Sequence, residues 1–200
     1  MSMPAKTYHH GDLRAALVAT AVEMLEAGEA YSMRAVARRS GVSPTAPYRH
    51  FSDRGALDSA VAVEGFKDLR DDLDRAVAGA PAGADPVDVL GELGVAYVGF
   101  ALRRPAVFRL MFGGACDTAD SDRVQASQAL HAVLGDTLAR LLPGQESPAL
   151  ATALWGLAHG LAFLHLDGKY RPEPAADVAE RVRAAAAAIL AVQPGVSDGA

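Results

Sequence analysis

Residues 33–51 read MRAVARRSGVSPTAPYRHF, and this stretch decides the fold of the first part of the chain. Its first piece has apolar residues on one helix face. This piece is expected to stop at Ser40-Gly41, because glycine tolerates the left-handed conformation of a tight turn. Ser43 is expected to cap a second helix, with Pro44 at the first helical position, where a missing N–H costs nothing. Two short helices joined by a glycine-containing turn predict a helix-turn-helix.

The residues before this stretch predict one more helix. Residues 12–27 carry apolar side chains at three- and four-residue steps, which is the spacing of one helix face. Asp12 is expected to cap this helix at its positive end, and Gly28 is expected to end it. Ser32 is expected to cap the helix that follows, so three helices are expected by residue 51.

Together the stretches YHHGDLRAALVATAVEMLEAG and SMRAVARRSGVSPTAPYRHFSDRGAL resemble the N-terminal domain of TetR-type transcriptional regulators. The shared order is a first helix, a helix-turn-helix, a Tyr-x-x-Phe ending at Tyr48 and Phe51, and a basic residue three positions later. That residue is Arg54 here, where the family usually has lysine. Pro47 departs from the family pattern and biases Ala46 away from the α region, so a distorted start of the second helix is expected.

The resemblance implies a DNA-binding domain over residues 1–54. Tyr48 and Arg54 are expected to bind phosphates, and polar side chains on the second helix suit phosphates and base edges. Arg38 and Arg39 could contact the DNA backbone or be solvated, and the arm around His9-His10 could touch DNA or be disordered. The residues expected to contact DNA are Arg34, Thr45, Ala46, Tyr48, Arg49, His50 and Arg54.

Composition and charge fit a helical DNA-binding protein. Half of the 200 residues are hydrophobic, and alanine outweighs β-branched and aromatic residues, which favours helices over strands. The net charge is −5, but residues 1–54 hold seven Lys/Arg and five Asp/Glu, so the remainder carries −7. A basic head on an acidic body suits DNA binding, because attraction to phosphate depends on the local face. The single Cys116 excludes an internal disulfide, and a polar N-terminus without a secretory signal indicates a cytoplasmic protein.

Further helices are expected after residue 51, which makes the fold all-α with about nine helices. They are expected at about residues 53–78, 86–104, 106–112, 121–142, 147–166 and 175–192. The Gly/Ala/Pro-rich residues 79–84 predict a break between parts of the chain. The expected organisation is a DNA-binding domain (1–54), a linker helix (55–80), a ligand-binding and dimerisation domain (81–193) and a disordered tail (194–200).

The stretch from Pro148 to Leu166 has no Asp, Glu, Lys or Arg. Its length and composition are compatible with a membrane span, but an all-round apolar helix is more often buried in protein. We therefore expect one face to pack in its own domain and the other against a partner subunit, with no membrane. The family resemblance implies a homodimer through residues 147–166 and 175–192. The pattern Trp155-Gly156-x-x-His159-Gly160 is similar to a Trp-His-Gly type of C-terminal domain in this family.

A small apolar or amphipathic effector is expected among the middle helices. Aromatic and methionine side chains with one or two polar groups are typical of such sites, although each residue taken alone is better explained by core packing. His159 is the expected hydrogen-bonding group. The candidates are Tyr97, Phe100, Phe108, Met111, Phe112, Trp155, His159 and Phe163.

The expected function is a transcriptional regulator, acting as a repressor that binds a palindromic operator as a dimer and is released by the effector. No phosphate loop, dinucleotide fingerprint, nucleophile elbow or metal-binding helix pair is found in the sequence, so no enzyme activity, cofactor or metal is expected. Three alternatives remain open: a small-molecule-binding helical protein without DNA binding, a membrane-associated helical protein, and an activator.

Overall fold

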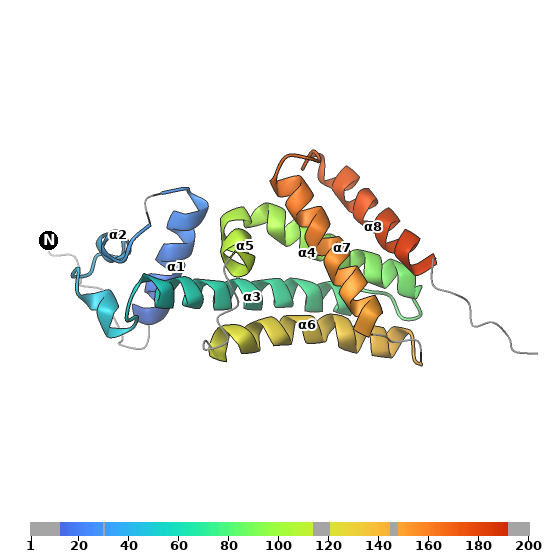
Figure 1. Cartoon of the computed structure of the whole chain (residues 1–200), viewed down its shortest axis with the longest axis horizontal. Coiled ribbons are helices and arrows are strands. Elements are labelled where there is room, and N and C mark those ends of the chain that lie inside the picture. The colour runs from blue at the N-terminus through green and yellow to red at the C-terminus, as the bar shows by residue number, and fades with distance from the viewer. Residues whose placement is uncertain (1–12, 30, 114–120, 145–147, 192–200) are drawn as a thin grey trace, which may run out of the picture. The chain divides into compact units, whose positions relative to one another are not determined.

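The computed structural model describes residues 13–29, 31–113, 121–144 and 148–191. All regular structure among these residues is helical, as the sequence predicts (Figure 1). It comprises eight α-helices and one 3-10 helix. They are α1 (Leu13–Glu26), α2 (Met33–Arg39), η1 (Ala46–Arg49), α3 (Arg54–Ala78), α4 (Pro86–Arg103), α5 (Pro105–Phe112), α6 (Ser121–Leu141), α7 (Pro148–Leu166) and α8 (Ala175–Ala191).

The chain forms two compact units. The first unit comprises the described residues of Met1–Gly65 and Ala106–Val124, and the second unit those of Phe66–Pro105 and Gln125–Ala200. Helix α3 contributes residues to both units. The division at residues 54 and 80, which is expected from the family resemblance and from the break at residues 79–84, stays a prediction.

Helices α1, α2 and the first half of α3 form the core of the first unit. Leu17, Val36 and Leu57 come from these three helices, and each is fully buried. The predicted cap of α2 is confirmed, because Ser32 Oγ accepts a hydrogen bond from the backbone N–H of Ala35 at 3.1 Å. The predicted glycine turn after α2 is also confirmed, because Gly41 has a φ of 70°.

Helix α5 belongs to the same unit and is held there by contacts with α1 and α3. The Glu26 carboxylate of α1 accepts hydrogen bonds from the backbone N–H groups of Ala106 (3.2 Å) and Val107 (3.0 Å), at the start of α5. A negative charge is favourable there, because the N-terminal N–H groups of a helix have no partners within it. On α3, a Cβ placed on Gly65 would lie 2.6 Å from Met111 Sδ and 2.7 Å from Val107 Cγ1, so α5 packs directly on the backbone of α3.

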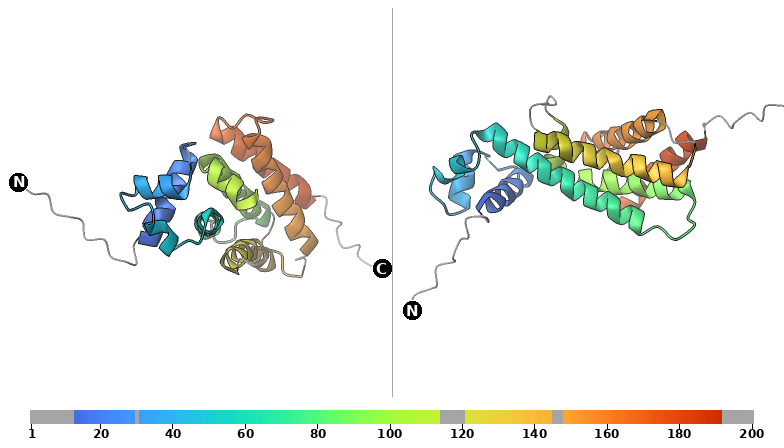
Figure 2. Two further views of the ribbon diagram at one scale, coloured as in Figure 1. Left: turned by 60° about the vertical axis from the view of Figure 1, so that its left-hand side comes forward. Right: turned by 90° about the horizontal axis from the view of Figure 1, so that it is seen from below.

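Helix α4 is central to the second unit and packs against both α7 and α8. Helices α7 and α8 lie side by side (Figure 1), and α6 runs along the later part of α3 (Figure 2). Charged pairs join these helices at the surface. Arg183 of α8 binds Glu92 of α4 at 2.5 Å, and Asp72 of α3 binds Arg103 of α4.

Helix α7 is the most apolar helix of the second unit. By length and composition it could cross a membrane, as the core helices of many soluble proteins could, and 33% of its most apolar segment is buried. Leu154, Ala158 and Leu161 are among its buried residues. Its uncovered side, called here the apolar face of α7, consists of Ala149, Thr152, Ala153, Gly156, Gly160 and Leu164, all exposed.

Candidate functional site

The second helix of the helix-turn-helix is shorter than expected. The sequence predicts a helix that starts at Pro44 with Ser43 as its cap, and this prediction is wrong. The first bond of such an α-helix would join the Ser43 carbonyl to the N–H of residue 47, and Pro47 has no N–H. The Ser43 carbonyl instead accepts from the Ala46 N–H at 3.0 Å, and only the 3-10 helix η1 forms, from Ala46 to Arg49.

This short helix still presents polar side chains to solvent. Thr45 and Tyr48 lie three residues apart, which places them on the same edge of a 3-10 turn. Thr45, Tyr48 and Arg49 are exposed, with 51% of Tyr48 accessible, while Ala46 and His50 are half-buried. Pro47 is fully buried on the opposite side and anchors the turn.

Arg54 is held at the first turn of α3 by two neighbours. Its Nε lies 3.5 Å from Asp58 Oδ2, and its guanidinium lies 4.8 Å from the centre of the Tyr31 ring. Burial of Tyr31, followed by the charge of Asp58, raises the pKa of this tyrosine, so it stays neutral beneath the guanidinium. More than half of the Arg54 side chain remains exposed, so the group is fixed and still accessible to a phosphate.

Two arginines of the neighbouring helix α2 have different surroundings from Arg54. Arg39 binds both oxygens of Glu29, at 2.5 and 2.6 Å, so its guanidinium is already paired within the chain. Arg34 is exposed on the same helix and remains a candidate for a DNA contact. The N-terminal arm with His9-His10 lies outside the described residues, as do Asp12, Cys116 and the tail from residue 194.

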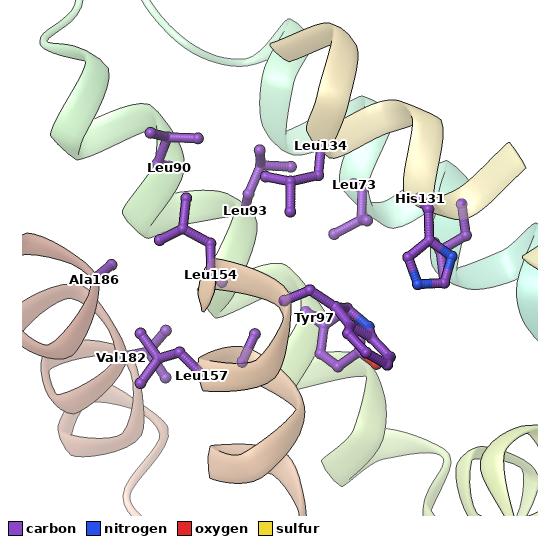
Figure 3. Close-up of a pocket in the computed structure, with 14 residues that line it drawn as sticks. Leu73, Leu90, Leu93, Tyr97, His131, Leu134, Leu154, Leu157, Val182 and Ala186 are labelled. Carbon is purple, nitrogen blue, oxygen red and sulfur yellow. The ribbon is translucent and has the colours of Figure 1, made fainter. Parts of the chain in front are cut away.

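A cavity lies among α3, α4, α6, α7 and α8 in the second unit (Figure 3). Its empty volume is about 630 Å³, part of which is open to solvent. The lining residues are Leu73, Leu90, Leu93, Gly94, Tyr97, Leu130, His131, Leu134, Leu154, Trp155, Leu157, Ala158, Val182 and Ala186.

The polar groups of this cavity gather at one end. Figure 3 shows Tyr97 and His131 on one side of the cavity and Leu90 and Ala186 on the opposite side. Tyr97 Oη lies 2.9 Å from His159 Nδ1, which is hydrogen-bonding distance. The Trp155 ring lies 5.0 Å from the His131 ring and 5.3 Å from the His159 ring, measured between centroids.

Burial favours the neutral forms of Tyr97 and His159. It raises the pKa of Tyr97, and the nearby Trp155 indole N–H offsets this effect only in part. Burial, and after it the charge of His131, lowers the pKa of His159. In the tautomer of neutral His159 that carries its proton on Nε2, Nδ1 accepts and the Tyr97 hydroxyl donates to it. The Trp155 indole N–H is itself buried and forms no hydrogen bond of ordinary length and angle among the described residues.

The structure divides the residues expected at the ligand site into three groups. Tyr97 and Trp155 line the cavity, and His159 and Phe163 adjoin it through ring contacts with Trp155 and with each other. Phe100 is buried in α4 and does not line the cavity. Phe108, Met111 and Phe112 belong to α5 in the first unit, where the rings of Phe108 and Phe112 lie 4.9 Å apart.

Sequence reasoning missed most of the cavity wall, which includes seven leucines. Leucines at helical spacing indicate a buried face but not whether that face packs against another side chain or surrounds empty space. Among the described residues, no group of three or more His, Cys, Asp or Glu side chains is arranged to hold a metal ion.

Comparison with known sequences gives both a family model and relatives. The model of the tetracyclin repressor-like C-terminal domain matches residues 90–189. An HTH-type transcriptional regulator of Mycobacterium tuberculosis is 35% identical over 92 residues, which are 46% of this chain and 39% of the regulator. The chain therefore spans about two fifths of the length of the curated relative that it matches. No finding tests the Trp-His-Gly subtype, which stays a prediction.

Solved structures share the fold over almost the whole chain. A Rhodococcus sp. RHA1 protein of unknown function is 32% identical, with a TM-score of 0.77, over 91% of this chain and 97% of that one. The TetR-like regulator LfrR of Mycobacterium smegmatis, in complex with proflavine, is 15% identical with a TM-score of 0.61. The superposition with LfrR covers 88% of this chain and 95% of LfrR, and at this identity it shows a common fold.

Proposed function

Because this chain belongs to the TetR family of transcriptional regulators, we propose that it binds operator DNA as a homodimer and is released by a small apolar or amphipathic effector. The observation that carries this proposal is one chain with both an exposed polar helix-turn-helix and an apolar cavity in a separate unit. Such a role needs no catalytic group, and it places the protein in the cytoplasm with its DNA.

The proposed DNA surface consists of the exposed side chains of α2, η1 and the start of α3. Tyr48 and Arg54 bind phosphates, while Thr45 and Arg49 reach phosphates or base edges in the major groove. Ala46 and His50 are half-buried, so they offer less surface to the DNA than the exposed side chains do. Two copies related by a two-fold axis would read a (pseudo)palindrome with half-sites about one turn apart, roughly 34–36 Å.

The proposed dimer forms through the apolar face of α7 and the adjacent α8. This face carries no charge, and nothing lies within 4 Å of a Cβ built on Gly156 or Gly160. Alanines 184 and 188 are exposed on α8, so small residues on both helices allow a second copy to approach closely. A self-complementary patch of this kind suits a two-fold interface, and it explains why so apolar a helix is largely uncovered in one chain.

Helix α3 is the proposed connection between effector and DNA. It carries Leu73 in the cavity wall and Arg54 at the DNA surface within one continuous helix. A ligand that binds one position of α3 more tightly than another would shift the equilibrium between DNA-binding and released states. LfrR, which shares the fold, is a complex with proflavine, and this supports a small-molecule role for the cavity.

A gel-shift titration on the DNA upstream of the protein's own gene, combined with sedimentation analysis, tests this proposal. We expect a salt-sensitive shift with two protein copies for each operator. A dimer that shifts this DNA no better than unrelated DNA would favour the alternative of a small-molecule-binding protein without DNA recognition. A monomer at micromolar concentration would contradict the proposed interface.

A further inference from the structure

We infer that the effector is a neutral, mainly aliphatic molecule whose single oxygen-containing headgroup accepts a hydrogen bond beside Trp155, Tyr97 and His159. This inference rests on the proposal that the cavity of the second unit is the effector site. It concerns the chemical class of the ligand, which the family membership leaves open.

The charge of the ligand follows from the lining of the cavity. None of the lining residues is Asp, Glu, Lys or Arg. A charged ligand buried there would lose its hydration without gaining an opposite charge from a buried side chain, because the lining histidine His131 is exposed to solvent, and this loss is strongly unfavourable. Burial also favours the uncharged forms of Tyr97 and His159, so neither supplies a counter-ion. The cavity therefore favours a neutral ligand.

The body of the ligand follows from the remaining wall. Seven leucines, Val182 and two alanines surround most of the space, and the cavity's aromatic residues are at the Tyr97 end. Flexible aliphatic side chains match an aliphatic chain or ring, whose transfer from water contributes roughly 0.8 kcal/mol for each CH₂ group.

The headgroup follows from an unsatisfied donor. The Trp155 indole is donor-only, its Nε1 is buried, and it forms no hydrogen bond of ordinary geometry among the described residues. The Tyr97 hydroxyl lies 2.9 Å from His159 Nδ1, so this pair forms the polar end of the cavity beside the indole. A ketone, ester, lactone or alcohol oxygen would give the indole N–H a hydrogen bond of ordinary geometry, whereas a plain alkane would leave it only its contact with the Tyr97 hydroxyl.

The protein contains its own probe for this test. Trp155 is the single tryptophan of the chain and lies in the cavity wall, so intrinsic tryptophan fluorescence reports only on this site. We would titrate the full chain with methyl nonyl ketone, undecane, undecanoic acid and undecylamine, which share a chain length and differ in headgroup. Calorimetric titration would measure the same affinities without relying on the fluorophore.

The ketone is expected to bind saturably and about three- to ten-fold more tightly than undecane, the range of one net hydrogen bond. The acid and the amine are expected not to bind at concentrations that saturate with ketone. In calorimetry, Trp155→Phe should reduce the affinity for the ketone to that for the alkane. Tyr170→Phe, which removes a hydroxyl outside the cavity, should leave ketone binding unchanged.

Equal or tighter binding of the amine or the acid would overturn the inference, as would equal affinities for ketone and alkane or no binding of any probe. These titrations contain no DNA, so their failure leaves operator binding intact. Conversely, loss of operator recognition in the gel shift would remove the proposed regulatory function while leaving the ligand class measured here unchanged.

Discussion

Replacing Gly65 with alanine tests the packing of α5 against α3 in the first unit. A Cβ at this position would lie 2.6 Å from Met111 Sδ and 2.7 Å from Val107 Cγ1. Ordinary contacts between such atoms are about 3.5–4.0 Å, so both overlaps are about 1 Å. Met111 is flexible but 2% exposed, and Val107 is fully buried and stiff at χ1, so neither can move freely. Overpacking of this kind costs about 1–3 kcal/mol.

The matched control is Gly135→Ala in α6. Nothing lies within 4 Å of a Cβ at Gly135, so alanine there gains only its helix propensity, about 0.8–1.0 kcal/mol. The same gain applies to Gly65 and cancels when the two variants are compared. The unfolding free energy of Gly65→Ala should therefore be lower than that of Gly135→Ala by about 1–3 kcal/mol.

Thermal unfolding followed by far-ultraviolet circular dichroism, at equal protein concentrations, measures this difference. For a chain of this size each kcal/mol shifts the Tm by about 2–4 °C. The Tm of Gly65→Ala should be lower than that of Gly135→Ala by about 2–4 °C for each kcal/mol of the expected difference. If Gly65→Ala were as stable as Gly135→Ala, the direct packing of α5 on the α3 backbone would be refuted.

Three further predictions concern DNA binding, pH and the dimer. Arg54→Gln should lower by about one the slope of log affinity against log salt concentration for operator binding, whereas Arg70→Gln should leave this slope unchanged. Arg70 is a matched control because each arginine lies 3.5 Å from an aspartate four residues later, so the two differ in the proposed phosphate contact. The unfolding free energy should fall as the pH drops below about 6.5, the ordinary pKa of histidine, because the pKa values of His159 and His165 are lowered in the folded chain and the unfolded chain therefore binds more protons. Replacing both histidines with glutamine should flatten this part of the pH dependence, as measured by chemical unfolding at a series of pH values. An unchanged slope in that variant would contradict the prediction. Gly160→Leu should make the protein monomeric in sedimentation without changing its helical content, and a persistent dimer would argue against the apolar face of α7 as the interface.

Local sequence signals predicted the helices well. Ser32 caps α2, and Asp85, which precedes Pro86, accepts from the Val87 N–H at 2.8 Å, as expected for a helix that begins at this proline. These features depend on residues within three positions of each other, so the sequence contains all the information needed. Ser43 shows the limit of reading one signal alone. Ser43 and Pro44 have the pattern of a helix start, but Pro47 removes the first hydrogen bond of that helix.

The cavity could be predicted only in part. Tyr97 and Trp155 stand out because aromatic and polar groups are rare on these helices, and both line the cavity. Met111 and Phe108 have the same apolar character, yet α5 is turned towards α3 in the first unit. Periodicity identifies which side of a helix is buried, but not which neighbour it meets, so the assignment of these two residues required the three-dimensional structure.

Selection of operators from random DNA, performed in parallel with the unmodified chain and with a Tyr48→Ala/Arg49→Ala variant, tests the central claim most directly. Both side chains are exposed on η1, so their removal should leave the fold intact. The unmodified chain is predicted to enrich an inverted repeat with half-sites about one helical turn apart, and the variant to enrich nothing. Enrichment of the same repeat by both proteins, or by neither, would contradict the claim that this surface reads DNA.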